Sequence, residues 1–145
     1  MMMQKRPLMT DATEYKRQFT SPPDDVELVH DLLNSVWADA SNIGSADRFS
    51  FETALVELAS NIIRHADVGI GISYSITVQI FDGQLEATVI DDGEHTSVEH
   101  TETDMPDDLS ESGRGIPLIN ALVDHFSFDR DGDFNRWQII RKLTS

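Results

Sequence analysis

Glu57 and Asn61 are the first residues of this chain whose types and spacing could do chemistry. They stand four positions apart in the stretch LVELASNIIRHA, so on a helix they lie one above the other. An asparagine oxygen is a neutral hard ligand suited to Mg²⁺, and a carboxylate one turn away can hold a metal-bound water or accept a proton. The alternative is a solvated boundary position, because Leu55, Leu58 and Ile62 form the apolar stripe beside the pair.

A second candidate is Asp91-Asp92-Gly93, which ends an alternating strand pattern. The alternation puts Asp91 on the same face as Val89, so we expect its carboxylate to point toward the core. There it could accept a hydrogen bond from a buried donor such as the exocyclic amine of adenine, and Gly93 would let the backbone approach the base. The alternative is an ordinary Asp-Gly turn at a strand end.

A third candidate, Gly113-Arg114-Gly115, directly precedes a helical pattern. Glycines before a helix expose backbone N–H groups at the positive end of the helix dipole, which suits phosphate. Arg114 is the first basic residue after a long acidic segment, so it could reach the same phosphates or fix a lid. A lone Gly-x-Gly is weak evidence, since either glycine can simply release the chain from a turn.

Hydrophobic periodicity predicts the elements that must position these residues. The pattern favours one α+β domain over residues 13–145, with a mixed sheet covered on one face by helices, and a disordered tail over residues 1–12. The expected elements are a short edge strand at 15–20, helices from Asp24 or Asp25 to about Ala40 and from Ser45 or Asp47 to about Ala66, strands at 72–81 and 85–91 joined by an Asp82-Gly83 turn, a helix from Gly115 to about Val123, and strands near 126–130 and 136–141.

Composition excludes several classes of function. The 145 residues include no cysteine, which excludes disulfide scaffolds and thiolate chemistry. The net charge of −15 argues against direct nucleic-acid binding and against anionic membranes, and suits a partner with a basic face. No apolar run is long enough for a signal-peptide core or a membrane span, so we expect a cytoplasmic protein. Nine acidic residues and no lysine or arginine lie between Asp91 and Ser112, which is typical of a functional lid or a disordered insert.

The three candidates follow one another in an order that resembles a known family. Glu57-x-x-x-Asn61, Asp91-x-Gly93 and Gly113-x-Gly115 look like the N, G1 and G2 boxes of the GHKL ATPase superfamily, which includes gyrase and histidine kinases. The short chain, the two leading helices and the ending NRWQIIRKL resemble the anti-sigma factor serine/threonine kinases of bacterial partner-switching systems. The resemblance covers roughly residues 14–143 and implies the Bergerat fold, a two-layer sandwich with a mostly antiparallel sheet and three helices.

The resemblance also implies roles for single residues. Asn61 would coordinate the Mg²⁺ that bridges the ATP phosphates, and Glu57 would be the general base. Asp91 would bind the adenine amino group, with Gly93 shaping the base pocket. The remaining residues would serve the phosphates: Gly113 and Gly115 as lid hinges and N–H donors, Arg114 beside them, and His65 as a basic neighbour, although a histidine that caps the helix is an equal alternative.

The implied activity is phosphorylation of a STAS-domain antagonist by a protein that sequesters a sigma factor or another regulator. A homodimer is expected from the resemblance alone. The residues Glu94-His95-Thr96 after Gly93 and the acidic segment depart from the family pattern, which keeps a second hypothesis open: a catalytically silent module that acts by sequestration. The ATPase part of a histidine kinase is a weaker third hypothesis, because no dimerisation helix with a phospho-accepting histidine precedes the domain.

Overall fold

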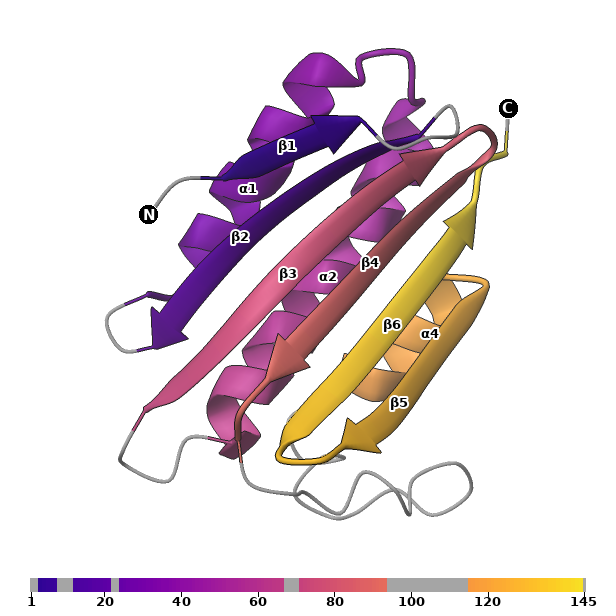
Figure 1. Ribbon diagram of the computed structural model, residues 1–145. Coiled ribbons are helices and arrows are strands. Elements are labelled where there is room, and N and C mark those ends of the chain that lie inside the picture. The colour runs from indigo at the N-terminus through magenta and orange to yellow at the C-terminus, as the bar shows by residue number, and fades with distance from the viewer. Residues whose placement is uncertain (1–2, 8–11, 22–23, 67–70, 94–114, 145) are drawn as a thin grey trace.

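The computed structural model describes residues 3–7, 12–21, 24–66, 71–93 and 115–144. These residues form two layers, a curved sheet and three helices that all lie on one of its faces (Figure 1). The predicted α+β sandwich is therefore confirmed. None of the helices in the described ranges is both long enough and apolar enough to span a bilayer.

Six strands run in the order β1-β2-β3-β4-β6-β5, and every pairing among them is antiparallel. The sequence patterns predicted a mixed sheet, so this detail is corrected. The strands are β1 (Gln4–Pro7), β2 (Thr13–Ser21), β3 (Ile72–Phe81), β4 (Gln84–Asp91), β5 (His125–Asp131) and β6 (Phe134–Lys142).

The N-terminal segment differs from the prediction. Residues 4–7, expected in a disordered tail, form β1, which pairs with β2 from Gln4 opposite Lys16 to Pro7 opposite Thr13. The strand predicted at 15–20 exists, but it is second from the edge because β1 covers it. A four-residue strand that ends in proline has too little alternation to be recognised in a sequence, and it forms because β2 offers a row of free backbone groups.

Three helices cover the sheet: α1 (Val26–Asp39), α2 (Ser45–Ala66) and α4 (Gly115–Leu122). Asp25 caps α1, since its carboxylate accepts a 3.0 Å hydrogen bond from the Glu27 N–H. The helix α2 packs against α1, α4, β4 and β6, so it forms the centre of the helical layer. Its predicted apolar stripe is fully buried: Phe51, Ala54, Leu55, Leu58, Ala59 and Ile62.

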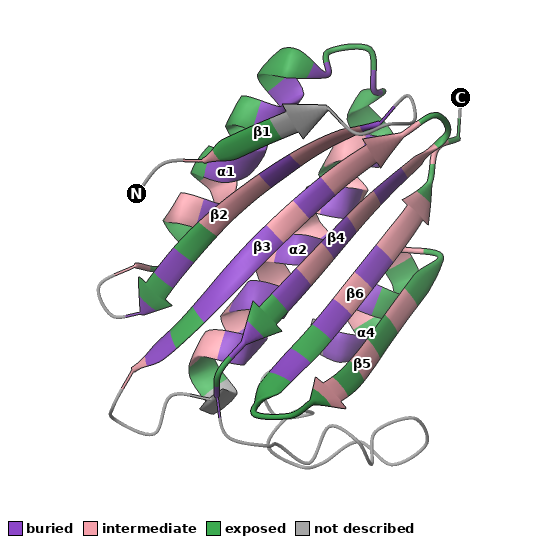
Figure 2. Ribbon diagram, in the orientation of Figure 1, coloured by how far each residue is buried: buried purple, intermediate pink, exposed green. Residues whose placement is uncertain are grey.

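The β3–β4 hairpin positions Asp91, the candidate site residue that ends β4. Asp82 and Gly83 form the predicted two-residue turn, with Gly83 at φ 88°, a conformation that favours glycine. Buried residues then alternate along β4 up to its last residue (Figure 2). Asp91 is one of these buried residues, which confirms that it points toward the helical layer.

Candidate functional site

The Asp91 carboxylate is the most buried charged group at its end of the sheet, with 1% of the residue exposed. Its Oδ1 accepts hydrogen bonds from the Gly93 N–H and from Asn135 Nδ2, both at 2.8 Å. Its Oδ2 accepts a 2.7 Å hydrogen bond from Trp137 Nε1. A buried carboxylate needs such partners, because an ion that loses its hydration without gaining them costs on the order of several kcal/mol.

The two side-chain donors both come from β6, as a consequence of strand register. Asp91 lies directly opposite Asn135, and Val89 lies opposite Trp137, so the two donors share the inner face of the sheet with Asp91. Asn135 is 1% exposed and Trp137 is 5% exposed. Strand β5 holds the indole in place, because Phe128 and Phe126 pack on Trp137 at centroid distances of 4.5 and 6.2 Å.

Sequence reasoning missed this role of Asn135 and Trp137. The alternation Asn135-x-Trp137-x-Ile139 does indicate that the three residues share a face. Asp91, which accepts from both donors, is 44 to 46 residues away in the chain, and no local signal identifies it as their partner.

Asn61 lies in the C-terminal half of α2, 4% exposed, and its side-chain Nδ2 has no hydrogen-bond partner. A buried donor without a partner costs about 1–3 kcal/mol, so such groups are rare and point to a missing ligand, ion or water. Glu57, one turn earlier, is half-buried, and no hydrogen bond or ion pair joins it to any described residue. Both side chains are therefore available for an external group.

Tyr74 presents a second buried polar atom without a partner. It lies opposite Asp91 in the β3–β4 ladder, stacks on Phe19 at 4.9 Å and is 1% exposed, and its hydroxyl makes no hydrogen bond. Burial raises the pKa of Tyr74, and the nearby carboxylates of Asp24 and Asp25 raise it further, so it stays a neutral donor. The sequence patterns identified Tyr74 only as a core residue.

Figure 1 shows how the elements bring the candidates toward one end of the molecule. The C-terminal end of α2 and the last residue of β4 lie at the same end. Within the described residues, Asp91 takes its hydrogen bonds from β6 and its own loop and none from α2.

The other predicted site residues fall at or beyond the limits of the described structure. Gly93 is buried, and its carbonyl accepts from Asn135 at 3.3 Å and from Arg130 at 3.4 Å. His65 lies in the last turn of α2 and Gly115 is the first residue of α4. The predictions for Gly113, Arg114 and the acidic segment after Gly93 lie outside the described residues.

This arrangement fits a magnesium nucleotide. The Asn61 oxygen is a suitable Mg²⁺ ligand, its unpartnered Nδ2 can donate to a phosphate oxygen, and Asp91 can accept from an exocyclic amine. The positive end of α4 lies at Gly115, one of the predicted phosphate-binding glycines.

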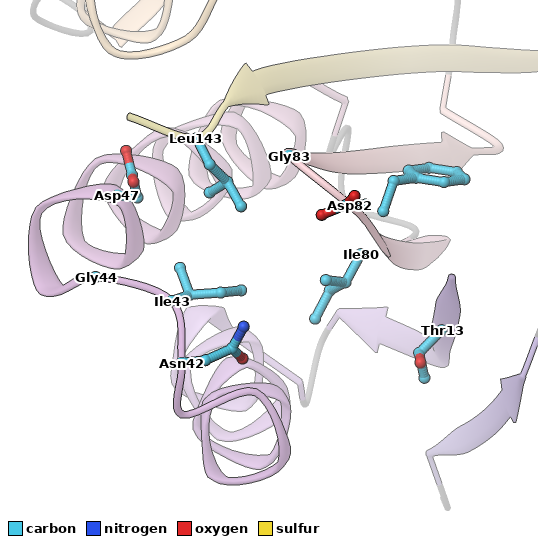
Figure 3. A pocket seen from close by; sticks show the side chains of 10 residues that line it. Thr13, Asn42, Ile43, Gly44, Asp47, Ile80, Asp82, Gly83 and Leu143 are labelled. Carbon is cyan, nitrogen blue, oxygen red and sulfur yellow. The ribbon is translucent and has the colours of Figure 1, made fainter. Parts of the chain in front are cut away.

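A pocket lies at the end of the sheet opposite Asp91. Figure 3 shows it between the start of α2, the β3–β4 turn and Leu143, with a volume of about 520 Å³. Asp47 lines it, but Arg141 and Thr144 occupy that carboxylate. A smaller pocket of about 360 Å³ lies between α1 and α2 and is lined by Asp25, Val26, Ser60, Ile63 and Arg64. Asp91 lines neither pocket.

Comparison with known proteins is consistent with this geometry. No curated protein matches the chain in sequence. The histidine kinase domain of the blue-light activated histidine kinase from Erythrobacter litoralis EL346 is similar in structure, with a TM-score of 0.51 at 20% identity, over 68% of this chain and 46% of that one. This chain thus spans about half the length of that structure.

The histidine kinase AdeS from Acinetobacter baumannii is also similar, with a TM-score of 0.50 at 16% identity, over 90% of this chain and 68% of that one. At these identities the two structures establish the fold alone. The family model of the histidine kinase-like ATPase domain matches residues 19–140, which is most of the chain. The chain therefore belongs to the family of histidine kinase-like ATPase domains.

Proposed function

We propose that this protein is an ATP-dependent serine/threonine kinase of the anti-sigma type, which phosphorylates a STAS-domain antagonist and sequesters a sigma factor or another regulator. The observation that carries the proposal is the buried Nδ2 of Asn61, which has no hydrogen-bond partner, one turn from Glu57, which no hydrogen bond or ion pair joins to another described residue. The order of Glu57-x-x-x-Asn61, Asp91-x-Gly93 and Gly113-x-Gly115 in a chain of this family supports it further.

Each residue has a defined task in this proposal. Mg-ATP, when bound, supplies the transferable phosphoryl group and the cation that neutralises its charge. Asn61 would ligate the Mg²⁺, and Asp91 would accept a hydrogen bond from the adenine amino group. Glu57 takes the proton of the substrate hydroxyl as that oxygen binds the γ-phosphorus and the bond to the ADP oxygen breaks. His65, Gly113, Arg114 and Gly115 serve the phosphates.

The decisive experiment measures transfer from radiolabelled ATP to a cognate STAS-domain protein. The wild type should label a serine or threonine, and the label should survive acid, whereas a phosphohistidine would not. Glu57→Gln should bind ATP but lose transfer. Glu52→Gln is the matched control on the same helix, because a glutamine oxygen can still accept from Trp37. No labelling at saturating Mg-ATP would exclude the kinase activity.

A second candidate function is a silent binding module of the same fold. The observation that favours it is that Asp91 is 1% exposed and already accepts three hydrogen bonds from its own chain. A calorimetric titration with Mg-ATP separates the two candidates. Heat that disappears in Asp91→Asn supports the kinase, and the absence of binding by the wild type supports the module.

A further inference from the structure

The pocket at the far end of the sheet from Asp91 belongs to a second surface of the molecule. Its volume is about 520 Å³, and it lies between the loop that leads into α2, the β3–β4 turn and Leu143 (Figure 3). The eight residues of β4 run from this turn to Asp91 and span roughly 24 Å, at about 3.4 Å per residue. A group that fills the pocket therefore lies away from the proposed nucleotide site.

The walls of this pocket are aliphatic. Ile43, Ile80 and Leu143 line it, and their side chains extend toward the same space in Figure 3. Ile43 is part of the buried core, and Ile80 and Leu143 are half-buried and pack against it. The core therefore holds these walls in place, and a ligand gains most from them if it brings an aliphatic part.

The pocket also presents a carboxylate that the described chain leaves unused. Asp82 in the β3–β4 turn is exposed, and no hydrogen bond or ion pair joins it to another described residue. The Asn42 side chain points into the same space (Figure 3). Asp47 differs, because Arg141 and Thr144 already occupy its carboxylate. None of the described residues that line the pocket is a lysine or an arginine, so its open charge is negative.

We propose that this pocket is a docking site for a basic side chain, an arginine or a lysine, of a protein partner. Such a side chain has an aliphatic stem, which fits the walls, and a cationic head, which can pair with the Asp82 carboxylate. The net charge of −15 favours the same kind of partner, because it attracts a basic face. The proposal goes beyond the kinase function and does not depend on it.

The lining also indicates that the basic side chain arrives on a polypeptide. Free arginine and free lysine carry an α-carboxylate, and the described lining holds no cation that could pair with it. Asp82 would repel that group, since like charges at short range disfavour each other. In a polypeptide a neutral peptide bond replaces the carboxylate, and the backbone can stay outside the pocket.

The probe for this proposal is N-acetyl-arginine amide, titrated into the nucleotide-free, isotopically labelled full chain and followed by NMR chemical shifts. We expect binding in the millimolar range, with the largest shifts at the amides of residues 42–44, 80–83 and 143. N-acetyl-citrulline amide has the same shape and no charge, so it should bind about threefold more weakly, the effect of one partly exposed ion pair. Free arginine should also bind more weakly than the capped form.

Asp82→Asn tests the charge, and Asp133→Asn is its matched control. Both aspartates are exposed and lie in a hairpin turn beside a glycine of positive φ, Gly83 at 88° and Gly132 at 63°. Asp133 does not line the pocket, but its substitution changes the net charge by the same amount. We expect Asp82→Asn to lower the affinity for the capped arginine about threefold and to abolish the preference over the citrulline probe. Asp133→Asn should change neither.

The titration needs no nucleotide, so its outcomes are independent of the proposed kinase activity. The proposal holds if the capped arginine shifts the pocket amides and if Asp82→Asn weakens this binding while Asp133→Asn does not. It is wrong if the capped arginine shifts no pocket amide, or if the two variants weaken binding equally. It is also overturned if free arginine or the citrulline probe binds as tightly as the capped arginine, because the pocket then takes a different ligand.

Discussion

Asp47 and Asp91 are each 1% exposed, one near the start of α2 and the other at the end of β4, and they are held in different ways. Asp47 Oδ1 accepts from Arg141 Nε at 3.0 Å and Nη2 at 2.9 Å, and its Oδ2 accepts from the Thr144 N–H and hydroxyl at 3.1 Å each. Four donors fill its acceptor positions, and one donor group is a cation. Among the residues that the structure describes, Asp91 accepts from three neutral donors and from no cation.

The two aspartates differ in whether the described residues fill every acceptor position of the carboxylate. The chain satisfies Asp47 completely, and that bond network fastens the C-terminal segment to α2. Within the described residues Asp91 accepts three hydrogen bonds, which leaves one acceptor position without a donor, and Asn61 and Tyr74 each have a buried side-chain atom without a partner. The pocket beside Asp47 is the larger of the two pockets (Figure 3), yet no acceptor position of that carboxylate is left for a ligand.

The largest expected effect is on the free energy of unfolding, which should differ between variants of the two buried aspartates. Asp47→Ala leaves the Arg141 guanidinium, whose side chain is 17% exposed, without its carboxylate partner, so we expect it to lower the free energy of unfolding by about 3 kcal/mol, the lower end of the range for a buried ion pair. Asp91→Ala removes partners of neutral donors only and should cost about 1–3 kcal/mol. Urea denaturation measures both, with Asp82→Ala in the exposed turn as control. Equal losses for the two buried aspartates would contradict the distinction.

The next effect is on nucleotide binding, in which a change at Asp91 should matter more than a change at Asp47. Asp91→Asn should weaken Mg-ATP binding by about tenfold or more, because an amide presents an N–H where the ligand amine must donate. Asp47→Asn, studied at a temperature where it is folded, should bind Mg-ATP with wild-type affinity, since no atom of Asp47 is left for a ligand. Calorimetric titration of the two variants side by side checks this, and a weaker affinity in Asp47→Asn would refute it.

A smaller effect follows from pH. Burial acts to raise the pKa of Asp47, but the Thr144 N–H and the Arg141 guanidinium outweigh it, so the pKa lies below its usual value of 3.8. A carboxyl whose pKa is lowered by folding stabilises the protein fully above its unfolded pKa of about 3.9, and this contribution disappears as pH falls through the folded pKa. The stability gap between wild type and Asp47→Asn should therefore be constant from pH 7 to about pH 5 and shrink in more acidic urea titrations. A gap that stays the same at low pH would show that Asp47 acts by packing alone.

The smallest effect extends the comparison to an exposed carboxylate. Asp39 has a cationic partner like Asp47, because Lys5 Nζ lies 2.8 Å from its Oδ2, and the Tyr15 hydroxyl donates to the same oxygen at 3.3 Å. The hydrogen bond from Lys5 lowers the pKa of Asp39, but the two side chains are 50% and 43% exposed. Water and salt screen such a pair, so Lys5→Met should leave the urea midpoint unchanged at physiological salt. A clear loss would mean that β1 is fastened to α1 more strongly than exposed charges allow.

The local patterns of the sequence determined much of this protein. The bounds of β3 and α2, the Asp82-Gly83 turn and the inward direction of Asp91 follow from periods of 2 and 3.6 residues and from turn chemistry, which act over a few neighbouring residues. The predicted pair Glu57 and Asn61 likewise needed only the helical period, although its role at a nucleotide stays a prediction.

Only the tertiary structure decided what those residues meet. The pairing of β1 with β2, the donors that Asn135 and Trp137 offer to Asp91, and the closure of Asp47 by Arg141 all join segments far apart in the chain. Strand register and helix packing set these contacts, because a shift of one residue would turn every side chain of β6 to the other face. Local periodicity shows which face a residue takes, and the packing of the whole sheet selects its partner.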